Sequence, residues 1–412
     1  MIRIKPFIGY RPNYSLVEKV AALPYDVVSD EEARNLIKDN PYSFLNIDKH
    51  ELNVKENQTK DMVYKGAEEY LKRFIKDKIL IHDTEKSIYI YGIETELGVH
   101  YGIITCLHCE DYSIGRIKRH EKVREEKRKD RMAYINLCNY QTAPIMLIHQ
   151  ENYKVQKWIF NNVNNNKPLY NFKDENDMSH TIFKISDKSE VRYITNLFKE
   201  IEVLYLADGH HRTDSLEKYA KIKKQNDPAY STDKGYNYLL GVIFGQEQVL
   251  IRSYNRVIKD ISGLSENEIF NKLCEKFIIK QRDELEYVPN NKNIIGMRYN
   301  KKWYQLELKE EEKNKLNTVQ SLDVNILQEF ILNPIFKITD PTIDSNIEFI
   351  GGDKGVKELN RMTEKDMDIA FSLFATDMND FINIINSGEL MPPKSTWFEP
   401  KIRRGLFVYE MN

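Results

Sequence analysis

A strand and a helix are expected on either side of one glycine in the segment Val203-Leu204-Tyr205-Leu206-Ala207-Asp208-Gly209-His210-His211-Arg212-Thr213. The apolar run 203–206 predicts a buried strand. Leu216, Tyr219 and Ala220 share one face of the helix that follows. A helix that begins at a glycine turn leaves backbone N–H groups unpaired at its start, where the helix dipole favours an anion.

The side chains on this turn favour a phosphate site. Arg212 has the planar fork that matches phosphate oxygens, and His210 and His211 can donate hydrogen bonds or move protons. The alternatives are that Gly209 is only a turn residue and that the histidines lie on the surface. A metal-dependent hydrolase that uses both histidines is disfavoured, because neighbouring residues on a helix point about 100° apart.

The bulk composition bounds the class of protein. The 412 residues suffice for two or three domains, and a net charge of −2 gives no global attraction to nucleic acid or to anionic membranes. No apolar run reaches the length of a membrane span, and four cysteines fit a protein of the reducing cytoplasm. The CxxC spacing at Cys106 and Cys109 lacks a second ligand pair, so we expect a buried thiol pair rather than a zinc site.

The pattern of elements predicts a mixed α/β fold in three segments. Residues 1–110 form an N-terminal α/β segment, residues 111–260 hold the chemistry, and residues 261–412 form a C-terminal α/β segment. The best-supported local elements are a capping box at Ser29 and Glu32, an amphipathic helix over 58–78, and a strand pair, 87–94 and 101–107, joined by a turn at Gly98.

Four further expectations concern connections and surfaces. Residues 161–167 are rich in asparagine and are expected to form a surface loop. The apolar runs 238–244 and 249–258 are expected to form a hairpin. The run 116–131, with nine Lys or Arg against four Asp or Glu, is expected to be a solvated helix face. The paired prolines make 391–396 a stiff loop, either a lid over a site or a surface crossing.

The order of several motifs resembles two groups of proteins. A His-Glu pair at 120–121, a charged helix, a Pro-Ile strand at 144–145 and the Asp208–Arg212 turn are similar to the free serine kinases of the ParB/sulfiredoxin-like fold. Over nearly its whole length the chain also resembles a large bacterial and archaeal family labelled as a domain of unknown function, whose members often accompany genes of phosphorylated serine biosynthesis. Its marks here are Arg11-Pro12, Leu23-Pro24-Tyr25-Asp26-Val27, His120-Glu121, Asp130-Arg131, Asp208-Gly209-His210-His211-Arg212, Arg256-Val257, Met391-Pro392-Pro393-Lys394-Ser395-Thr396, Pro400-Lys401 and Gly405-Leu406.

The kinase resemblance implies a ParB/sulfiredoxin-like core over 111–260 and a cytoplasmic phosphotransferase. It implies that ATP or ADP donates a phosphoryl group to free L-serine or a similar small substrate, giving O-phosphoserine, with Mg²⁺ present. Glu121 of the His120-Glu121 pair would act as the base on the hydroxyl, in one cleft with the phosphate-binding residues Gly209, His210, His211 and Arg212.

The remaining roles implied by the resemblance are weaker. Asp208 would hold Mg²⁺ through water or position the histidines, although it fits equally a helix cap. Substrate binding is assigned to Asp26, Arg131, Lys394, Ser395 and Thr396, for each of which a turn, an exposed ion pair or a surface loop is the alternative. Asn255 stands where the resemblance leads us to expect a histidine before Arg256.

A different class of function stays open at this point. A ParB-like nucleotide-binding switch, associated with nucleic acid, would explain the basic run 116–131. The near-neutral net charge and the lack of a helix-turn-helix pattern make nucleic acid an unlikely partner.

Overall fold

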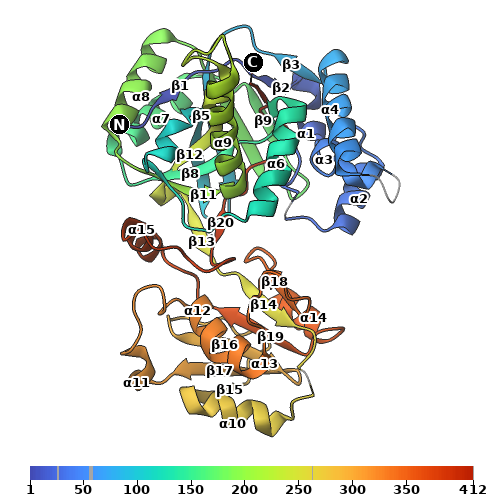
Figure 1. Ribbon diagram of the computed structural model, residues 1–412, viewed down its shortest axis with the longest axis vertical. Helices are drawn as coiled ribbons and strands as arrows, with labels where there is room; N and C mark the ends of the chain where they lie inside the picture. The colour runs from blue at the N-terminus through green and yellow to red at the C-terminus, as the bar shows by residue number, and fades with distance from the viewer. Residues whose placement is uncertain (26, 55–58, 262, 412) are drawn as a thin grey trace. The chain divides into compact units, whose positions relative to one another are not determined.

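The computed structural model describes residues 1–25, 27–54, 59–261 and 263–411. Their packing divides the chain into two compact units (Figure 1). Unit 1 contains Met1–Arg119, Val123–Val249 and Pro400–Asn412, and unit 2 contains His120–Lys122 and Leu250–Glu399. The last residues of the chain thus return to unit 1 after unit 2 is complete. The three sequence segments stay a prediction, and Asp26 lies outside the described residues.

A mixed nine-stranded sheet forms the centre of the described part of unit 1. The pairs β12–β8 and β11–β6 are parallel, and the other pairs are antiparallel. Every residue of β8 and of β12 is buried, which explains why both read as unbroken apolar runs. The order is β6 (Ile117–Lys118), β11 (Leu204–Asp208), β8 (Ile145–His149), β12 (Tyr238–Gly245), β5 (Gly98–His108), β4 (Ile88–Thr95), β10 (Ser179–Ile185) and β9 (Tyr170–Lys173), with β1 (Ile4–Lys5) on β5.

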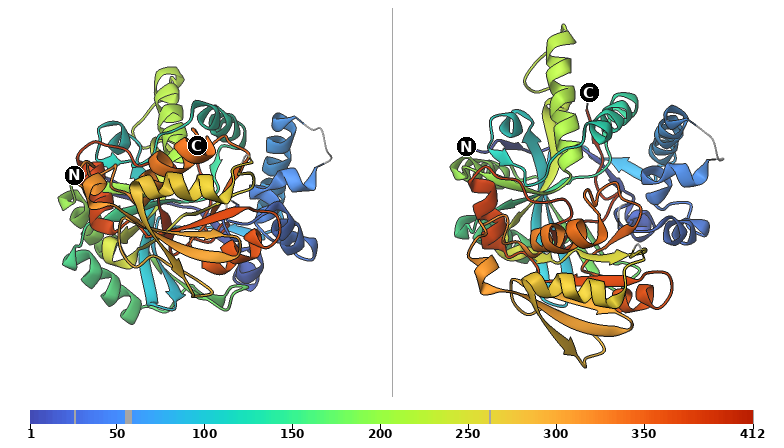
Figure 2. Two further views of the ribbon diagram at one scale, coloured as in Figure 1. Left: turned by 90° about the horizontal axis from the view of Figure 1, so that it is seen from below. Right: turned by 60° about the horizontal axis from the view of Figure 1, so that its bottom comes forward.

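Helices cover both faces of this sheet (Figures 1 and 2). On one side lie α7 (Tyr153–Asn165) and α8 (Lys188–Glu200). On the other side α9 (His210–Asn226) packs against α6 (Glu125–Cys138). The site at the start of α9 is therefore held between the sheet and a second helix.

The N-terminal part of unit 1 adds a smaller helical cluster beside α6. It has its own apolar core, which includes Phe44, Leu71 and Phe74. The Ser29–Glu32 capping box is confirmed, with both reciprocal hydrogen bonds present, and so is the long amphipathic helix. The elements are β2 (Tyr10–Pro12), α1 (Val17–Val20), α2 (Asp30–Lys38), α3 (Leu45–Asp48), α4 (Lys60–Lys76) and β3 (Leu80–His82).

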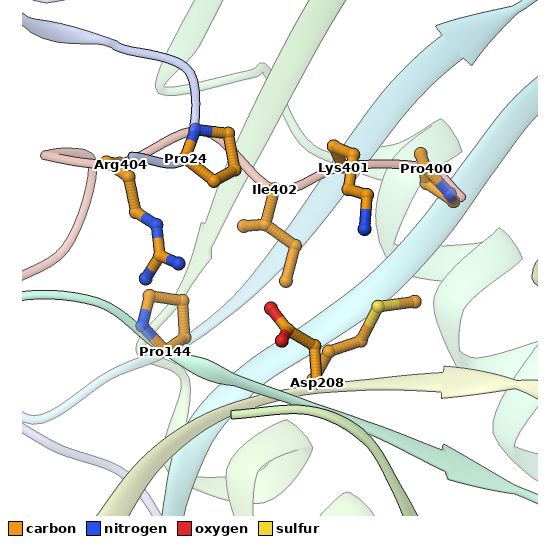
Figure 3. Close-up of a pocket in the computed structure, with 8 residues that line it drawn as sticks. Pro24, Pro144, Asp208, Pro400, Lys401, Ile402 and Arg404 are labelled. Carbon is orange, nitrogen blue, oxygen red and sulfur yellow. The ribbon is translucent and has the colours of Figure 1, made fainter. Parts of the chain in front are cut away.

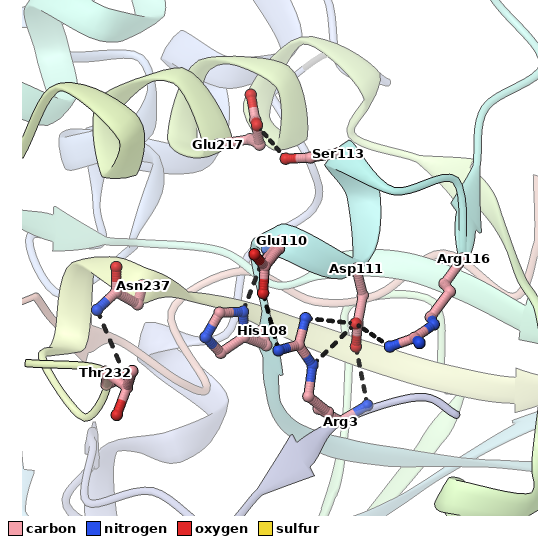
Figure 4. A network of polar contacts seen from close by, with 9 residues as sticks. All are labelled: Arg3, His108, Glu110, Asp111, Ser113, Arg116, Glu217, Thr232 and Asn237. Atoms are coloured by element: carbon pink, nitrogen blue, oxygen red, sulfur yellow. Dashed lines mark hydrogen bonds and ion pairs between the residues drawn. The ribbon is translucent and has the colours of Figure 1, made fainter. Parts of the chain in front are cut away.

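A buried carboxylate ties the N-terminus to the start of the basic segment (Figure 4). Asp111, in α5 (Glu110–Ser113), is fully buried and accepts hydrogen bonds from the backbone N–H of Arg3 at 2.8 Å and from its Nε at 2.9 Å. Arg116 Nη1 lies 3.3 Å from the same carboxylate. Two cations thus balance one buried anion and fix the chain just before β6.

Unit 2 is built on a six-stranded antiparallel sheet with helices packed on it. A separate two-stranded pair joins β13 (Leu250–Arg252) to β20 (Trp397–Glu399). The sheet order is β15 (Phe277–Arg282), β17 (Lys302–Leu308), β16 (Ile294–Tyr299), β19 (Ile369–Leu373), β14 (Asn255–Ile258) and β18 (Ile347–Ile350). The helices are α10 (Glu266–Lys276), α11 (Glu310–Lys313), α12 (Asp323–Leu327) with a π turn over Gln328–Leu332, α13 (Asn333–Phe336), α14 (Gly355–Thr363) and α15 (Met378–Asn386).

The predicted hairpin between 238–244 and 249–258 is wrong. Both edges of β12 are already occupied, by β5 and by β8. The chain after Val249 enters unit 2, where β13 pairs with β20 and β14 with β18 and β19. Two adjacent apolar runs predict strands, but the pairing partners are set by distant segments.

The predicted asparagine-rich loop at 161–167 is also wrong over most of its length. Helix α7 continues to Asn165, and Asn162 is buried on it. The amide of Asn162 donates to Glu190 Oε2 at 3.1 Å and to the carbonyl of Trp158 at 3.0 Å. Val155, Trp158, Ile159 and Asn162 share one buried helix face, so packing overrides the turn preference of asparagine.

The expected mixed α/β class is confirmed by this arrangement. The strand pair β4–β5 around Gly98 is confirmed as well, and Cys106 and Cys109 are both buried, free thiols. None of the helices in the described ranges combines the length and the apolar character that a bilayer span requires.

Candidate functional site

The turn between β11 and α9 has the geometry that the sequence predicts. Gly209 adopts φ +95°, in the left-handed region, and α9 begins at His210. A Cβ on residue 209 would also lie 2.8 Å from Ile145 Cγ2. Glycine is therefore required twice, by the backbone conformation and by the close approach of β8. Asp208 does not cap the helix, because Gly209 occupies the cap position.

Asp208 stands at the end of β11 among cations. Its Oδ2 lies 3.6 Å from Arg212 Nη2, one helical turn along the chain. Burial opposes ionisation of the carboxyl, but the positive charges of Arg212, Lys401 and Arg404 outweigh it and hold the pKa of Asp208 well below its ordinary value. Asp208 is thus an anion at neutral pH, surrounded by more positive than negative charge.

Arg212 has a structural partner that the sequence does not reveal. Its Nη1 donates to the carbonyl oxygens of Ala143 at 2.9 Å and of Pro144 at 2.8 Å. These bonds fasten the start of α9 to the segment that enters β8. Arg212 therefore orients the turn with one side of its guanidinium and approaches Asp208 with the other.

A narrow pocket of about 10 Å³ lies beside Asp208 (Figure 3). The Asp208 carboxylate is directed toward the C-terminal segment that carries Lys401 and Arg404. The lining residues come from four parts of the chain: Pro24, Pro144, Met146, Asp208, Pro400, Lys401, Ile402 and Arg404. Pro24, Pro400 and Lys401 are among the motif residues, but Arg404 is a site residue that sequence reasoning missed. Its place beside Asp208 depends on the return of the chain to unit 1.

Two guanidinium groups lie close to the ring of Tyr25, beside this pocket. Arg131 lies 5.0 Å and Arg404 5.9 Å from the centre of its ring. Arg404 Nε also lies 3.9 Å from the buried Oδ2 of Asp48. Burial opposes the charge on Arg131, but Tyr25, Tyr134 and Asp48 outweigh it and raise its pKa. Arg131, predicted as a weak substrate-binding candidate, is therefore a fixed cation in the same unit as Asp208.

The two histidines of the turn differ in exposure. His210 is buried and His211 is partly exposed. Within the first turn of α9, Thr213 Oγ1 donates a hydrogen bond to the carbonyl of Gly209 at 3.0 Å. No cluster of three or more His, Cys, Asp or Glu residues that suits a metal ion occurs in the described ranges. Because cations already surround Asp208, its setting suits phosphate oxygens better than a bare divalent cation.

The His-Glu pair and the proline-rich loop come together in unit 2. His120 is buried, and its Nε2 lies 3.2 Å from Thr396 Oγ1 and 3.9 Å from Glu121 Oε1. Its carbonyl accepts a hydrogen bond from Met391 N at 2.8 Å. The Glu121 side chain keeps 30% of its surface exposed.

Phenylalanine rings enclose the imidazole of His120. The rings of Phe381 and Phe398 lie 5.0 and 5.7 Å from it. Apolar rings thus pack around His120, while its Nε2 lies near the polar atoms of Thr396 and Glu121.

Arg256 binds the backbone of the loop 391–396. This buried guanidinium donates from Nη2 to the Lys394 carbonyl at 2.9 Å and from Nη1 to the Tyr254 carbonyl. Burial lowers the pKa of Arg256 to about 9. Lys394 adopts φ +56°, and its Nζ donates to the Tyr254 hydroxyl at 3.2 Å. Ser395 is buried and donates to the Pro392 carbonyl, so it stabilises the loop instead of facing solvent.

Asn255 has a structural contact where a histidine was expected. Its Oδ1 accepts a hydrogen bond from the backbone N–H of Leu373 at 3.1 Å, across the β14–β19 pair. Asn255 is buried and joins the two strands. The expected single cleft for Glu121 and the Gly209 turn stays a prediction, because the two groups belong to different units.

The fold and the pocket define a mixed α/β protein with a cationic site at a strand–helix turn. The chain belongs to the family described as a protein of unknown function (DUF1015), whose model matches residues 4–325. No curated protein matches the sequence.

Three solved structures resemble the chain at low identity. A free serine kinase in complex with AMP has a TM-score of 0.39 and 14% identity, covering 75% of this chain and 91% of that one. A conserved hypothetical protein from Pyrococcus furiosus has a TM-score of 0.35 and 15% identity, over 74% of this chain and 95% of that one. A C-terminally truncated SbnI from Staphylococcus aureus has a TM-score of 0.39 and 10% identity, over 74% and 87%.

Proposed function

We propose that this protein is a small-molecule kinase that transfers a phosphoryl group from ATP or ADP to the hydroxyl of free L-serine. The observation that carries the proposal is the pocket at Asp208, where Arg212, Lys401 and Arg404 lower the pKa of the carboxyl. Such an excess of cations over anions is matched by the phosphates of a nucleotide. The motif order described above supports serine as the acceptor.

The phosphate-binding part of the proposal rests on unit 1. The backbone N–H groups that follow Gly209 lie at the N-terminus of α9, where they can bind an anion. Lys401 supplies a compact ammonium charge and Arg404 a planar guanidinium. His210 and His211 are assigned to the same ligand. Mg²⁺ would arrive with the phosphates, since their negative charge offsets the cations around Asp208. Asp208 would then hold the ion through water.

The proton-transfer part rests on unit 2. The serine hydroxyl oxygen attacks the terminal phosphorus, a new O–P bond forms, and the bond from that phosphorus to the nucleotide breaks. Glu121 accepts the hydroxyl proton, and the nucleotide leaves with one phosphate fewer. Within unit 2, His120 and Thr396 lie beside Glu121 and would orient it, and Lys394 is assigned to a phosphate or to the substrate carboxylate.

The nucleic-acid alternative receives less support from the structure. Two arginines of the basic run 116–131 are paired within unit 1: Arg128 Nη1 lies 3.3 Å and Arg119 Nη1 3.9 Å from Asp214. Asp130 accepts from Lys60 at 2.7 Å. Paired charges attract phosphate backbones less than free ones do.

The test is a ³¹P NMR assay of purified protein with Mg²⁺, L-serine and either ATP or ADP. With L-serine we expect an O-phosphoserine resonance with at least one donor. With L-threonine in its place we expect a weaker resonance of O-phosphothreonine. Nucleotide binding without any phosphorylated amino acid would contradict the kinase and favour a nucleotide-binding switch.

Glu121→Gln tests the base. We expect turnover to fall by about 10²-fold or more, the usual contribution of a general base, while nucleotide affinity stays within twofold. Glu126→Gln, in the same charged run, is the matched control and should keep full turnover. Unchanged turnover of Glu121→Gln would remove Glu121 as the base.

A further inference from the structure

The C-terminal segment that brings Lys401 and Arg404 to the pocket is fastened by the arginine between them. Arg403 is 1% exposed, and among the largest fully buried side chains of the described residues. Its Nη1 donates to Glu175 Oε1 at 2.7 Å, and its Nη2 pairs with Asp174 Oδ2. Both carboxylates lie in the connection between β9 and β10, at the far edge of the large sheet.

The carboxylate that receives Arg403 is itself fully engaged. Asp174 Oδ1 accepts from the backbone N–H of Asn176 at 2.8 Å and of Met178 at 3.0 Å. Its Oδ2 bonds to His180 Nε2 at 2.9 Å, and His180 Nδ1 bonds to the Tyr91 hydroxyl at 2.9 Å. Burial opposes the charge of Asp174, but His180 and Arg403 outweigh it and hold its pKa well below the ordinary value. The network is therefore charged at neutral pH and anchored in two strands.

The backbone of the segment has its own contacts near the pocket. Arg404 exchanges backbone hydrogen bonds with Ala22, at 2.8 and 3.2 Å, and Gly405 follows at φ +79° against Phe44. Residues 400–402 form no helix or strand. The side chain of Arg403 thus adds a buried anchor to these backbone contacts, at the position between Lys401 and Arg404.

We propose that Arg403 is a positioning residue for the phosphate pocket, acting through its buried ion pair with Asp174 and its ion pair with the exposed Glu175. It holds the backbone of 400–404 so that Lys401 and Arg404 present their charges beside Asp208. The inference rests on the proposed function for the identity of the ligand, but the anchoring itself does not. Arg403 does not line the pocket, whereas its neighbours on both sides do.

The first test measures the binding of inorganic pyrophosphate and of MgADP by titration calorimetry. We expect Glu175→Gln to weaken binding by about threefold and Arg403→Lys by about tenfold, because a small displacement of a binding group is costly. Arg403→Gln should weaken it further, so that lysine gives partial rescue. Arg298→Gln is the matched control: it removes another buried arginine pair, with Glu364 in unit 2, and should leave both affinities within twofold.

Hydrogen exchange without ligand tests the anchoring separately. In folded Arg403→Lys or Glu175→Gln protein, we expect faster exchange over residues 400–406 and unchanged exchange in β8 and β12. If Arg403→Gln does not fold, the other two variants decide. Wild-type exchange and affinity in both of them would overturn the proposal. A wild-type protein that binds neither probe would contradict the proposed function, while faster exchange at 400–406 would still support the positioning role.

Discussion

At the scale of one residue, Gly209 sets the geometry of the turn between β11 and α9. Its φ of +95° and the 2.8 Å approach to Ile145 act together on any larger side chain. Asp208 and Arg212 are placed by the same turn, one at the end of β11 and one in the first turn of α9. These three positions were predictable from the sequence. A glycine between an apolar run and a helix pattern marks a turn, and that inference needs only the neighbouring residues.

Gly209→Ala is expected to destabilise the protein by more than the backbone strain alone. Left-handed backbone costs a residue with a Cβ about 1–2 kcal/mol, and contact with Ile145 adds to it. Gly98→Ala is the matched control, since Gly98 has φ +113° with nothing within 4 Å of its added Cβ. Urea unfolding should show a larger loss for Gly209→Ala. Equal losses for both variants would contradict the steric role of Ile145.

Asp323 makes the stability of unit 2 depend on pH. It is buried, its Oδ1 accepts from Asn293 N at 2.7 Å, and its Oδ2 has no hydrogen-bond partner among the described residues. Burial raises the pKa of Asp323 to about 7, against hydrogen bonds from Asn293 and Phe374 and the charge of Lys292. Since the unfolded carboxyl titrates near 3.9, the folded state holds more protons between these values. Stability therefore falls as pH rises from about 4 to about 7.

Asp323→Asn should remove this loss. Between pH 5 and pH 8 we expect its unfolding free energy to rise relative to that of the wild type by about 3 kcal/mol, since about two of the three pKa units of the wild-type loss lie above pH 5. Asp283→Asn, at an exposed position in the same unit, should change stability equally at both pH values. An Asp323→Asn protein that is no more stable than the wild type at pH 8 would contradict a raised pKa.

At the scale of elements, local patterns predicted helices and strands well and their partners less well. The α2 capping box, α4 and the β4–β5 pair follow from signals within a few residues. The pairing of β13 with β20 joins residues far apart in the chain, and no local pattern contains that information. Asn162 shows the reverse case, in which burial beside Glu190 keeps a turn-forming residue in a helix.

Ser29→Ala tests the element whose start was clearest in the sequence. Ser29 Oγ accepts from Glu32 N at 3.2 Å, and Glu32 Oε2 accepts from Ser29 N at 2.7 Å. Loss of the cap is expected to lower the unfolding free energy by about 1 kcal/mol, whereas Ser29→Gly should cost only a few tenths. Equal effects of alanine and glycine in urea unfolding would indicate that the cap does not stabilise α2.

At the scale of the whole molecule, the site depends on the return of the chain to unit 1. Residues 250–399 form unit 2 before Pro400, and Lys401 and Arg404 then reach Asp208. Pro400-Lys401 stood among the motif residues, but the sequence did not show that this segment meets Asp208 or that Arg404 belongs to the site. No sequence pattern links residues that lie so far apart in the chain. The loop 391–396 was expected as a stiff loop, but the buried role of Ser395 and its support by Arg256 required the tertiary structure.

The most direct measurement is a crystal structure of the wild-type protein grown with MgADP. We expect density for the two phosphates at the start of α9, with oxygens within hydrogen-bond distance of the backbone N–H groups after Gly209 and of Lys401 or Arg404. Phosphates bound elsewhere, or a pocket that stays free of nucleotide at saturating MgADP while the protein is folded, would contradict this expectation.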